Sequence, residues 1–151
     1  MPRARVTQRN RPAKLYFAYG SNMHIPSMRI RCPRARLLST ALLSDWEFFI
    51  NTQGYASIRP VDDQEVHGAL WTIGPREEAA LDLYEDVADQ LYLRVTVNVI
   101  SSRETHRDVL TYVATNRRPG RPRAGYMPLV HESAEQLDLP EGYRDFLRTW
   151  D

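Results

Sequence analysis

The most informative stretch of the sequence is Leu15-Tyr16-Phe17-Ala18-Tyr19-Gly20-Ser21-Asn22. Its first four residues are apolar or aromatic and predict a short buried strand. The Gly20-Ser21-Asn22 sequence favours a turn, and Pro26 suits the first turn of a helix that ends before Pro33. We therefore expect a strand, a turn and a helix N-terminus, where backbone N–H groups, a hydroxyl and an amide converge.

The remainder of the chain reads as many short strands with a few helices. Strands are predicted at residues 35–43, 46–50, 56–59, 66–73, 91–99 and 109–114, with turns at 44–45 and 62–64. Helices are predicted at 75–84, 133–137 and from Pro140 onward, and 116–125 is predicted to be a loop. Because this order lacks a regular βαβ alternation, it favours an α+β fold with a mixed, barrel-like β-sheet and a few peripheral helices.

Bulk properties favour one globular domain. The chain has 151 residues, 42% of them hydrophobic, and a net charge of +1, so nothing global predicts binding to nucleic acid or membrane. We expect a basic tail at residues 1–13, which is rich in arginine, and a domain at 14–151. Cys32 is the only cysteine, which fits a reducing, cytoplasmic location.

Two features suggest chemistry. The turn at Tyr19 to Asn22 is a natural site for a carboxylate or an oxyanion, although Ser21 or Asn22 capping the helix is an equally simple interpretation. Glu85 lies at the end of a predicted helix, where a carboxylate opposes the helix dipole. The alternative for Glu85 is a solvated surface acid. The four histidines are too dispersed to predict a metal site.

The chain resembles the γ-glutamylcyclotransferase-like (AIG2-like) family, in particular its bacterial type. The motifs that carry the resemblance occur in the expected order and span about Lys14 to Leu147. They are Leu15–Met23, the residues Met28, Arg31-Cys32-Pro33 and Ala35, then Val66–Trp71, Leu81–Glu85, Leu91–Arg94, Gly125-Tyr126 and Leu139–Tyr143.

The resemblance implies an enzyme that cyclises a γ-glutamyl group to 5-oxoproline and releases an amine or amino acid, without a cofactor. It implies that Glu85 is catalytic. It implies a place in glutathione metabolism, a small-molecule substrate and no nucleic-acid or membrane partner, and it leaves a homodimer open. The implied substrate-binding residues are Tyr19, Gly20, Ser21, Asn22, Met23, Tyr92 and Tyr126.

Two departures from the family pattern bear on the site. Asp86 follows Glu85 where the family usually has glycine, and residues 116–123 carry four arginines. Two alternatives therefore stay open: a catalytically silent binding module on the same fold, and a cyclotransferase for γ-glutamyl-amines or carrier-linked γ-glutamyl products.

Overall fold

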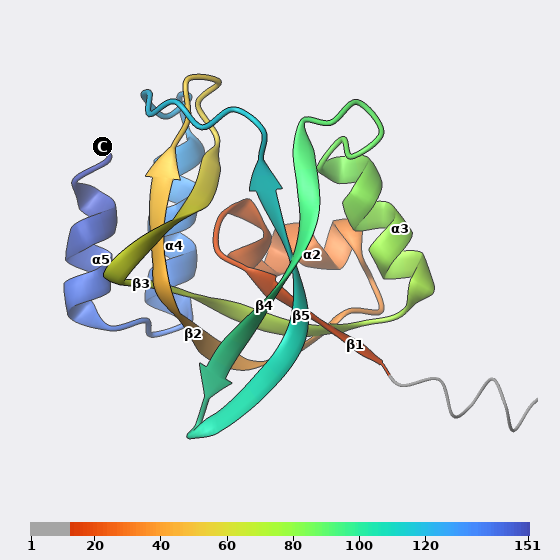
Figure 1. Ribbon diagram of the computed structural model, residues 1–151. Coiled ribbons are helices and arrows are strands. Elements are labelled where there is room, and N and C mark those ends of the chain that lie inside the picture. The colour runs from red at the N-terminus through yellow and green to blue at the C-terminus, as the bar shows by residue number, and fades with distance from the viewer. Residues whose placement is uncertain (1–12) are drawn as a thin grey trace, which may run out of the picture.

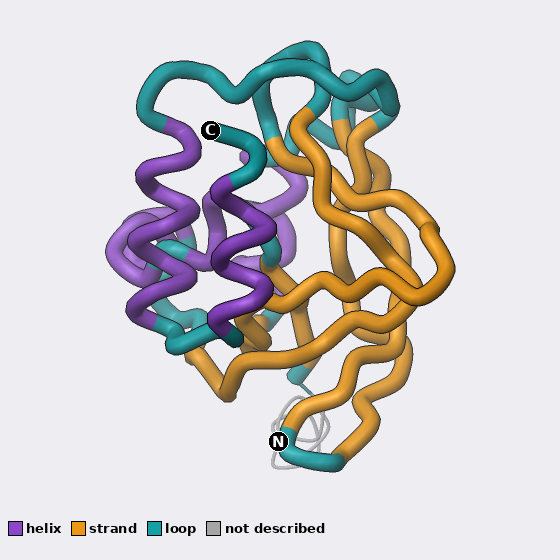
Figure 2. Tube along the Cα trace, turned by 90° about the vertical axis from the view of Figure 1, so that its left-hand side faces the viewer, coloured by secondary structure: helices purple, strands orange, loops and turns teal. Residues whose placement is uncertain are grey.

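The computed structural model describes residues 13–151. The predicted basic tail therefore lies outside the described residues, except for Ala13. The described part forms a β-barrel (Figure 1), and Figure 2 shows the helices on one side of the strands. Within residues 13–151, the helices are all too short or too polar to span a membrane.

Five strands close the barrel in the order β1-β3-β2-β4-β5. They are β1 (Lys14–Ala18), β2 (Arg36–Ile50), β3 (Ala56–Ile73), β4 (Tyr92–Ser101) and β5 (Glu104–Ala114). Strand β1 runs parallel to β5, and the other neighbours pair antiparallel. The predicted α+β class with a mixed, barrel-like sheet is confirmed.

The predicted turns at 44–45 and 62–64 are wrong as chain reversals. They are irregularities inside the continuous strands β2 and β3. Asp45 and Asp63 both adopt a φ of 65°, and the Asp63 amide donates a hydrogen bond of 3.0 Å to the Asp45 carboxylate. Such local breaks in a ladder bend the strands, which helps a small sheet to curve and close.

The helical elements of the described residues are η1 (Ser21–Met23), α2 (Ile25–Arg31), α3 (Pro75–Tyr84), α4 (Tyr126–Gln136) and α5 (Glu141–Arg148). Helix α4 begins seven residues earlier than the predicted start at 133, directly after Gly125, whose φ is 82°. Pro128 is accepted because it lies in the first turn, where its missing N–H has no helical partner to lose. Tyr126 is therefore the first residue of α4.

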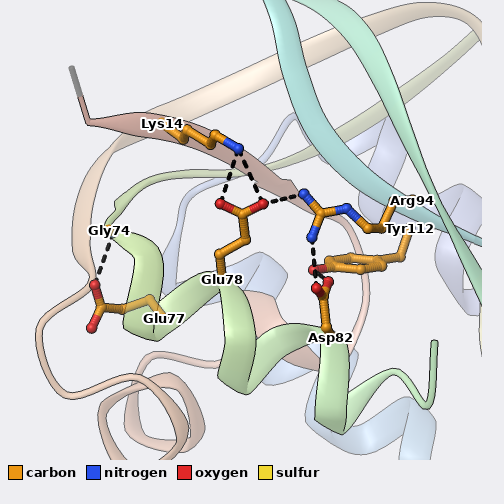
Figure 3. Close-up of polar contacts among 7 residues, drawn as sticks. All are labelled: Lys14, Gly74, Glu77, Glu78, Asp82, Arg94 and Tyr112. Atoms are coloured by element: carbon orange, nitrogen blue, oxygen red, sulfur yellow. Dashed lines mark hydrogen bonds and ion pairs between the residues drawn. The ribbon is translucent and has the colours of Figure 1, made fainter. Parts of the chain in front are cut away.

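A network of ion pairs holds α3 against the barrel (Figure 3). Glu78 of α3 pairs with Lys14 of β1 and with Arg94 of β4. Arg94 also donates to Asp82, one turn further along α3, at 2.6 Å. The Tyr112 hydroxyl of β5 donates to the same Asp82 carboxylate at 2.6 Å. Three strands therefore contact one face of α3, and this contact sets the position of the helix end.

Gly68 lies directly before Ala69, the residue of β3 that pairs with Ala18 at the end of β1. A Cβ atom at this position would lie 2.2 Å from the Ala18 carbonyl oxygen and 3.0 Å from the Phe17 ring. A glycine inside a strand is expected where another backbone approaches closely. The close approach occurs directly before the chain leaves β1 for the Tyr19–Asn22 turn, so Gly68 helps to place that turn.

We predict that Gly68→Ala lowers the free energy of unfolding by about 2 kcal/mol or more, because the added methyl overlaps a backbone oxygen that cannot move freely. The measurement is urea denaturation followed by circular dichroism. Gly142→Ala is the matched control, because no atom lies within 4 Å of a Cβ atom at that position. Equal stability of the Gly68→Ala variant and the wild type would contradict this account of the β1–β3 contact.

Candidate active site

A cavity of about 180 Å³ is lined by residues from several segments that are far apart in the chain, between Tyr16 and Tyr126. Its volume is smaller than that of pockets for drug-sized ligands, so it suits a group of amino-acid size. Tyrosine dominates the wall. The lining residues are Tyr16, Tyr19, Gly20, Ser21, Asn22, Tyr55, Ala56, Tyr84, Glu85, Leu91, Tyr92, Tyr112 and Tyr126.

Seven of the eight residues assigned to the site from the sequence line this cavity together. They are Tyr19, Gly20, Ser21, Asn22, Glu85, Tyr92 and Tyr126. Met23, the eighth, does not line it: its side chain is 0% exposed and packs in the hydrophobic core. The 3-10 turn of η1 rotates Met23 away from Gly20 and Ser21, so the apolar side chain faces the interior of the protein.

The three residues of the Gly20–Asn22 turn line the cavity. The Met23 and His24 amides close the turn by donating to the carbonyls of Gly20 and Ser21 at 3.0 and 3.1 Å. The first amides of a helical turn have no partner within it. Those of Ser21 and Asn22 therefore suit an anionic group or a polarised carbonyl oxygen.

Gly20 is required because Tyr126 approaches its backbone. A Cβ atom at position 20 would lie 2.8 Å from the Tyr126 hydroxyl and 3.2 Å from the Ala56 side chain. The Ala56 amide donates to the Tyr126 hydroxyl at 3.3 Å. Burial raises the pKa of Tyr126, so its hydroxyl stays protonated at neutral pH and keeps a proton to donate.

Tyr19 and Tyr92 shape the wall and use their hydroxyls elsewhere. Tyr19 donates to the Tyr112 carbonyl at 2.5 Å, and Tyr92 donates to the Ala56 carbonyl at 2.7 Å. Tyr92 is buried, as expected for a residue on the side of β4 that faces the cleft. Both rings are thereby locked, and each leaves only its ring edge or hydroxyl lone pairs for a ligand.

Glu85 caps the C-terminus of α3 and is partly buried at the cavity. It follows Asp82 by three residues, so it lies on the helix face that the ion-pair network turns toward the barrel. Desolvation raises the pKa of its carboxyl to about 7, although the nearby Arg31 guanidinium favours the charged form. A carboxyl with such a pKa can both accept and donate a proton near neutral pH.

Asp86 adopts the left-handed backbone conformation that glycine favours. Its φ is 53°, directly after the cap residue of α3. This conformation explains in physical terms why glycine is suited to the position, and aspartate is among the side chains that tolerate it. A hydrogen bond with Asp89 is the main cause that raises the pKa of Asp86. The charge that acts on Glu85 is that of Arg31 and not that of Asp86.

Several lining residues were not foreseen. Tyr84 stands beside Glu85 in sequence, and its hydroxyl shares a hydrogen bond of 3.0 Å with the Ser21 hydroxyl. Tyr55 and Tyr112 come from distant strand positions that carry no local signal. The other unforeseen residues are Tyr16, Ala56 and Leu91.

The arginine-rich loop lies beside the cavity and not in its wall. Among its four arginines, Arg123 contacts a lining residue: its guanidinium lies 4.5 Å from the centre of the Tyr55 ring. Its Nε donates to the Gln53 carbonyl at 2.8 Å. Gly120 donates to the Ile50 carbonyl at 2.7 Å, so the loop is tied to the turn between β2 and β3. Across residues 13–151, no group of three or more His, Cys, Asp or Glu side chains is arranged to hold a metal ion.

Known proteins are similar to this chain in sequence and in fold. Human gamma-glutamylcyclotransferase is 28% identical over 153 residues, which cover 95% of this chain and 81% of the human protein. The mouse protein of that name is 28% identical over 144 residues, covering 89% and 77%. A solved structure described as a gamma-glutamyl cyclotransferase has a TM-score of 0.85 at 26% identity, covering 93% of this chain and 89% of its own.

The curated relatives are mammalian, so they do not bear out the expected bacterial type. The model of the AIG2-like family matches residues 65–147, which is more than half of the chain. This chain is a homologue of the γ-glutamylcyclotransferases and belongs to the AIG2-like family.

Proposed function

We propose that this protein is a γ-glutamylcyclotransferase that converts a γ-glutamyl compound into 5-oxoproline and a free amine. The observation that carries the proposal is Glu85: a partly buried carboxyl with a pKa of about 7 that shares a small cavity with the Gly20–Asn22 turn. The homology to proteins named for this activity supports the same assignment.

The reaction is an intramolecular aminolysis. The α-amino nitrogen of the substrate attacks its own γ-carbonyl carbon, a C–N bond forms and closes the five-membered ring, and the C–N bond to the leaving amine breaks. The α-ammonium group, with a pKa of about 7.7–8, must first lose a proton. Glu85 accepts this proton and returns it to the leaving amine. The attacking nitrogen loses a second proton when the ring closes, and the released amine takes up one proton to become an ammonium group, so no proton is gained or lost overall.

The remaining lining groups orient the substrate. The amides of the Gly20–Asn22 turn hold the substrate carboxylate or the oxyanion that develops on the γ-carbonyl oxygen. The Tyr126 hydroxyl, beside Gly20, is a further neutral donor. Fixing the flexible glutamyl chain at two points favours ring closure because less orientational entropy is lost in the transition state.

A silent binding module explains Glu85 less well. Burying a carboxylate is unfavourable, and here burial shifts its pKa to the value that proton transfer near neutral pH requires. A binding site for a γ-glutamyl group needs no such carboxyl. Perturbed carboxyls in clefts are typical of functional sites.

The finer assignments belong to the same proposal. We place the enzyme in the cytoplasm and in glutathione metabolism, as a protein that acts on a free γ-glutamyl compound without a cofactor. Residues 14–151 form its one domain, preceded by a basic tail. A γ-glutamyl-amine and a carrier-linked γ-glutamyl product are alternative substrates, and a homodimer is the alternative to a monomer. A panel of γ-glutamyl compounds assayed for 5-oxoproline release distinguishes the substrates.

We predict that Glu85→Gln lowers kcat for 5-oxoproline release by at least ~100-fold, because glutamine keeps the shape of the side chain but cannot accept the proton. Glu135→Gln is the control, since Glu135 is exposed on α4 and is not among the residues that line the cavity. Near wild-type turnover of Glu85→Gln would show that Glu85 is not the base.

The pH dependence of kcat/KM tests whether Glu85 takes the proton of the substrate ammonium group. We expect activity to fall below a pH of about 7, where Glu85 is protonated, and above ~8, where no proton remains for the leaving amine. The acidic limb of this profile is the fall in activity below a pH of about 7. Asp86→Asn should not shift the acidic limb, because Asp86 does not set the pKa of Glu85. A shift of that limb in Asp86→Asn would assign the raised pKa to the neighbouring charge.

The same pKa predicts a cost in stability. The Glu85 carboxyl has a pKa of about 7 when folded and about 4.5 when unfolded, so its ionisation favours unfolding as the pH rises between these values. Above a pH of about 7 the cost levels off at about 3 kcal/mol. Urea denaturation of Glu85→Gln should therefore show a gain over the wild type that is small near pH 4.5 and full at pH 8. A gain that does not change with pH would mean that Glu85 is not desolvated in the folded state.

A further inference from the structure

Arg31 contacts both halves of the cavity at once. It is the last residue of α2 and is partly buried. Its guanidinium donates a hydrogen bond to the Asn22 side-chain oxygen, on the substrate turn. The guanidinium carbon lies 3.6 Å from the centre of the Tyr84 ring, on the residue before Glu85. One planar group therefore links the turn that follows β1 to the end of α3.

On the side of the turn, Arg31 completes the hydrogen bonding of a buried amide. Asn22 is 2% exposed, and its side-chain nitrogen donates to the Tyr16 hydroxyl at 3.0 Å. Its backbone carbonyl accepts from the Trp71 indole at 3.2 Å. The remaining acceptor, Oδ1, is the one that Arg31 occupies. Without Arg31, this buried oxygen would lose its charged donor and Asn22 would be held less firmly.

On the side of the helix, Arg31 and Ser21 hold Tyr84 between them. The guanidinium stacks on the face of the ring, and the Tyr84 hydroxyl shares a hydrogen bond with Ser21. Stacking of this kind restrains the ring, and its interaction energy is larger when the contact is shielded from water. Because Glu85 follows Tyr84 directly, a restrained Tyr84 also restrains the backbone that carries the Glu85 carboxyl.

Electrostatics agrees with this geometry. The Arg31 charge favours the ionised form of Glu85 and opposes the larger effect of burial. Burial, and to a smaller extent the Glu85 charge, raises the pKa of five tyrosines around the cavity, so these groups are uncharged near neutral pH. They are Tyr16, Tyr19, Tyr92, Tyr112 and Tyr126.

We propose that Arg31 is a positioning residue that ties the Gly20–Asn22 turn to the Tyr84–Glu85 helix end and so sets the distance between the oxyanion-binding amides and the base. The inference rests on the proposed function, but Arg31 itself is outside the lining of the cavity. Lysine cannot replace it, because its ammonium group is a compact charge on a flexible side chain. Unlike a planar guanidinium, it neither stacks on an aromatic ring nor holds an amide oxygen in a fixed direction.

The test compares three variants. Arg31→Met removes the charge and the fork, Arg31→Lys keeps the charge alone, and Arg29→Met is the matched control from an exposed position on the same helix. We expect Arg31→Met to lower kcat by at least ~10-fold, because small misplacements of reacting groups are costly. Its acidic limb moves to higher pH. Arg31→Lys restores the position of the limb but not kcat, and Arg29→Met changes neither.

A double-variant comparison with Tyr84 distinguishes a positioning role of Arg31 from a general loss of structure. Tyr84→Leu removes the stacked ring, so Arg31→Met and Tyr84→Leu should lose kcat non-additively when combined, with the double variant close to the more damaged single variant. Additive losses overturn the link between the two residues. If Arg31→Met does not fold, Arg31→Lys combined with Tyr84→Leu gives the same comparison.

A binding-independent readout keeps this inference separate from the proposed function. The Glu85 carboxyl is titrated by NMR in each variant without substrate, using ¹³C-labelled glutamate and Glu85→Gln for assignment. A Glu85 pKa that rises in Arg31→Met, and not in Arg31→Lys or Arg29→Met, supports the placement of the Arg31 charge beside the Glu85 helix end even if no γ-glutamyl compound is cyclised. An unchanged Glu85 pKa, or a wild-type kcat in Arg31→Met, overturns the inference.

Discussion

Strand β1 pairs with β3 along one edge and with β5 along the other, and this double pairing closes the barrel. The strand has five residues, so its position depends on contacts on both sides. Thr111 donates to the Phe17 carbonyl at 2.8 Å from β5. On the other side, Gly68 of β3 allows the Ala18 carbonyl to approach. The Tyr19–Asn22 turn begins where β1 ends, so closure of the barrel places the turn beside β5 and the β2–β3 loop.

Helix α3 supplies the second half of the site, and its acidic side chains serve two different purposes. Glu78 and Asp82 face Arg94 and Lys14, which lower the pKa of Glu78 and keep this carboxylate ionised. Glu85 lies on the same face but reaches a cavity walled by tyrosines, where burial raises the pKa of its carboxyl. The paired carboxylates hold the helix, and the carboxyl left largely unpaired and desolvated is the one suited to move protons.

The tyrosines of the cavity wall combine an apolar surface with polar anchoring groups. They are large enough to exclude water from Glu85 and carry hydroxyls that bond to backbone carbonyls, as Tyr19 and Tyr92 do, or to another residue of the site, as Tyr84 does. An aliphatic wall would bury the carboxyl without such anchors, and a positively charged wall would lower its pKa. Tyrosine therefore gives the cavity both its shape and its electrostatics.

Local sequence was enough to predict the β1 strand, the turn after it and the placement of Glu85 at a helix end. These features depend on neighbouring residues or on residue type. The bends of β2 and β3, the early start of α4 and the burial of Met23 depended on packing, because polar turn signals, proline and methionine are each compatible with more than one structure. The meeting of Glu85 with Arg31, Tyr55 and Tyr112 followed only from closure of the barrel, since contacts between residues far apart in the chain leave no mark in the local pattern.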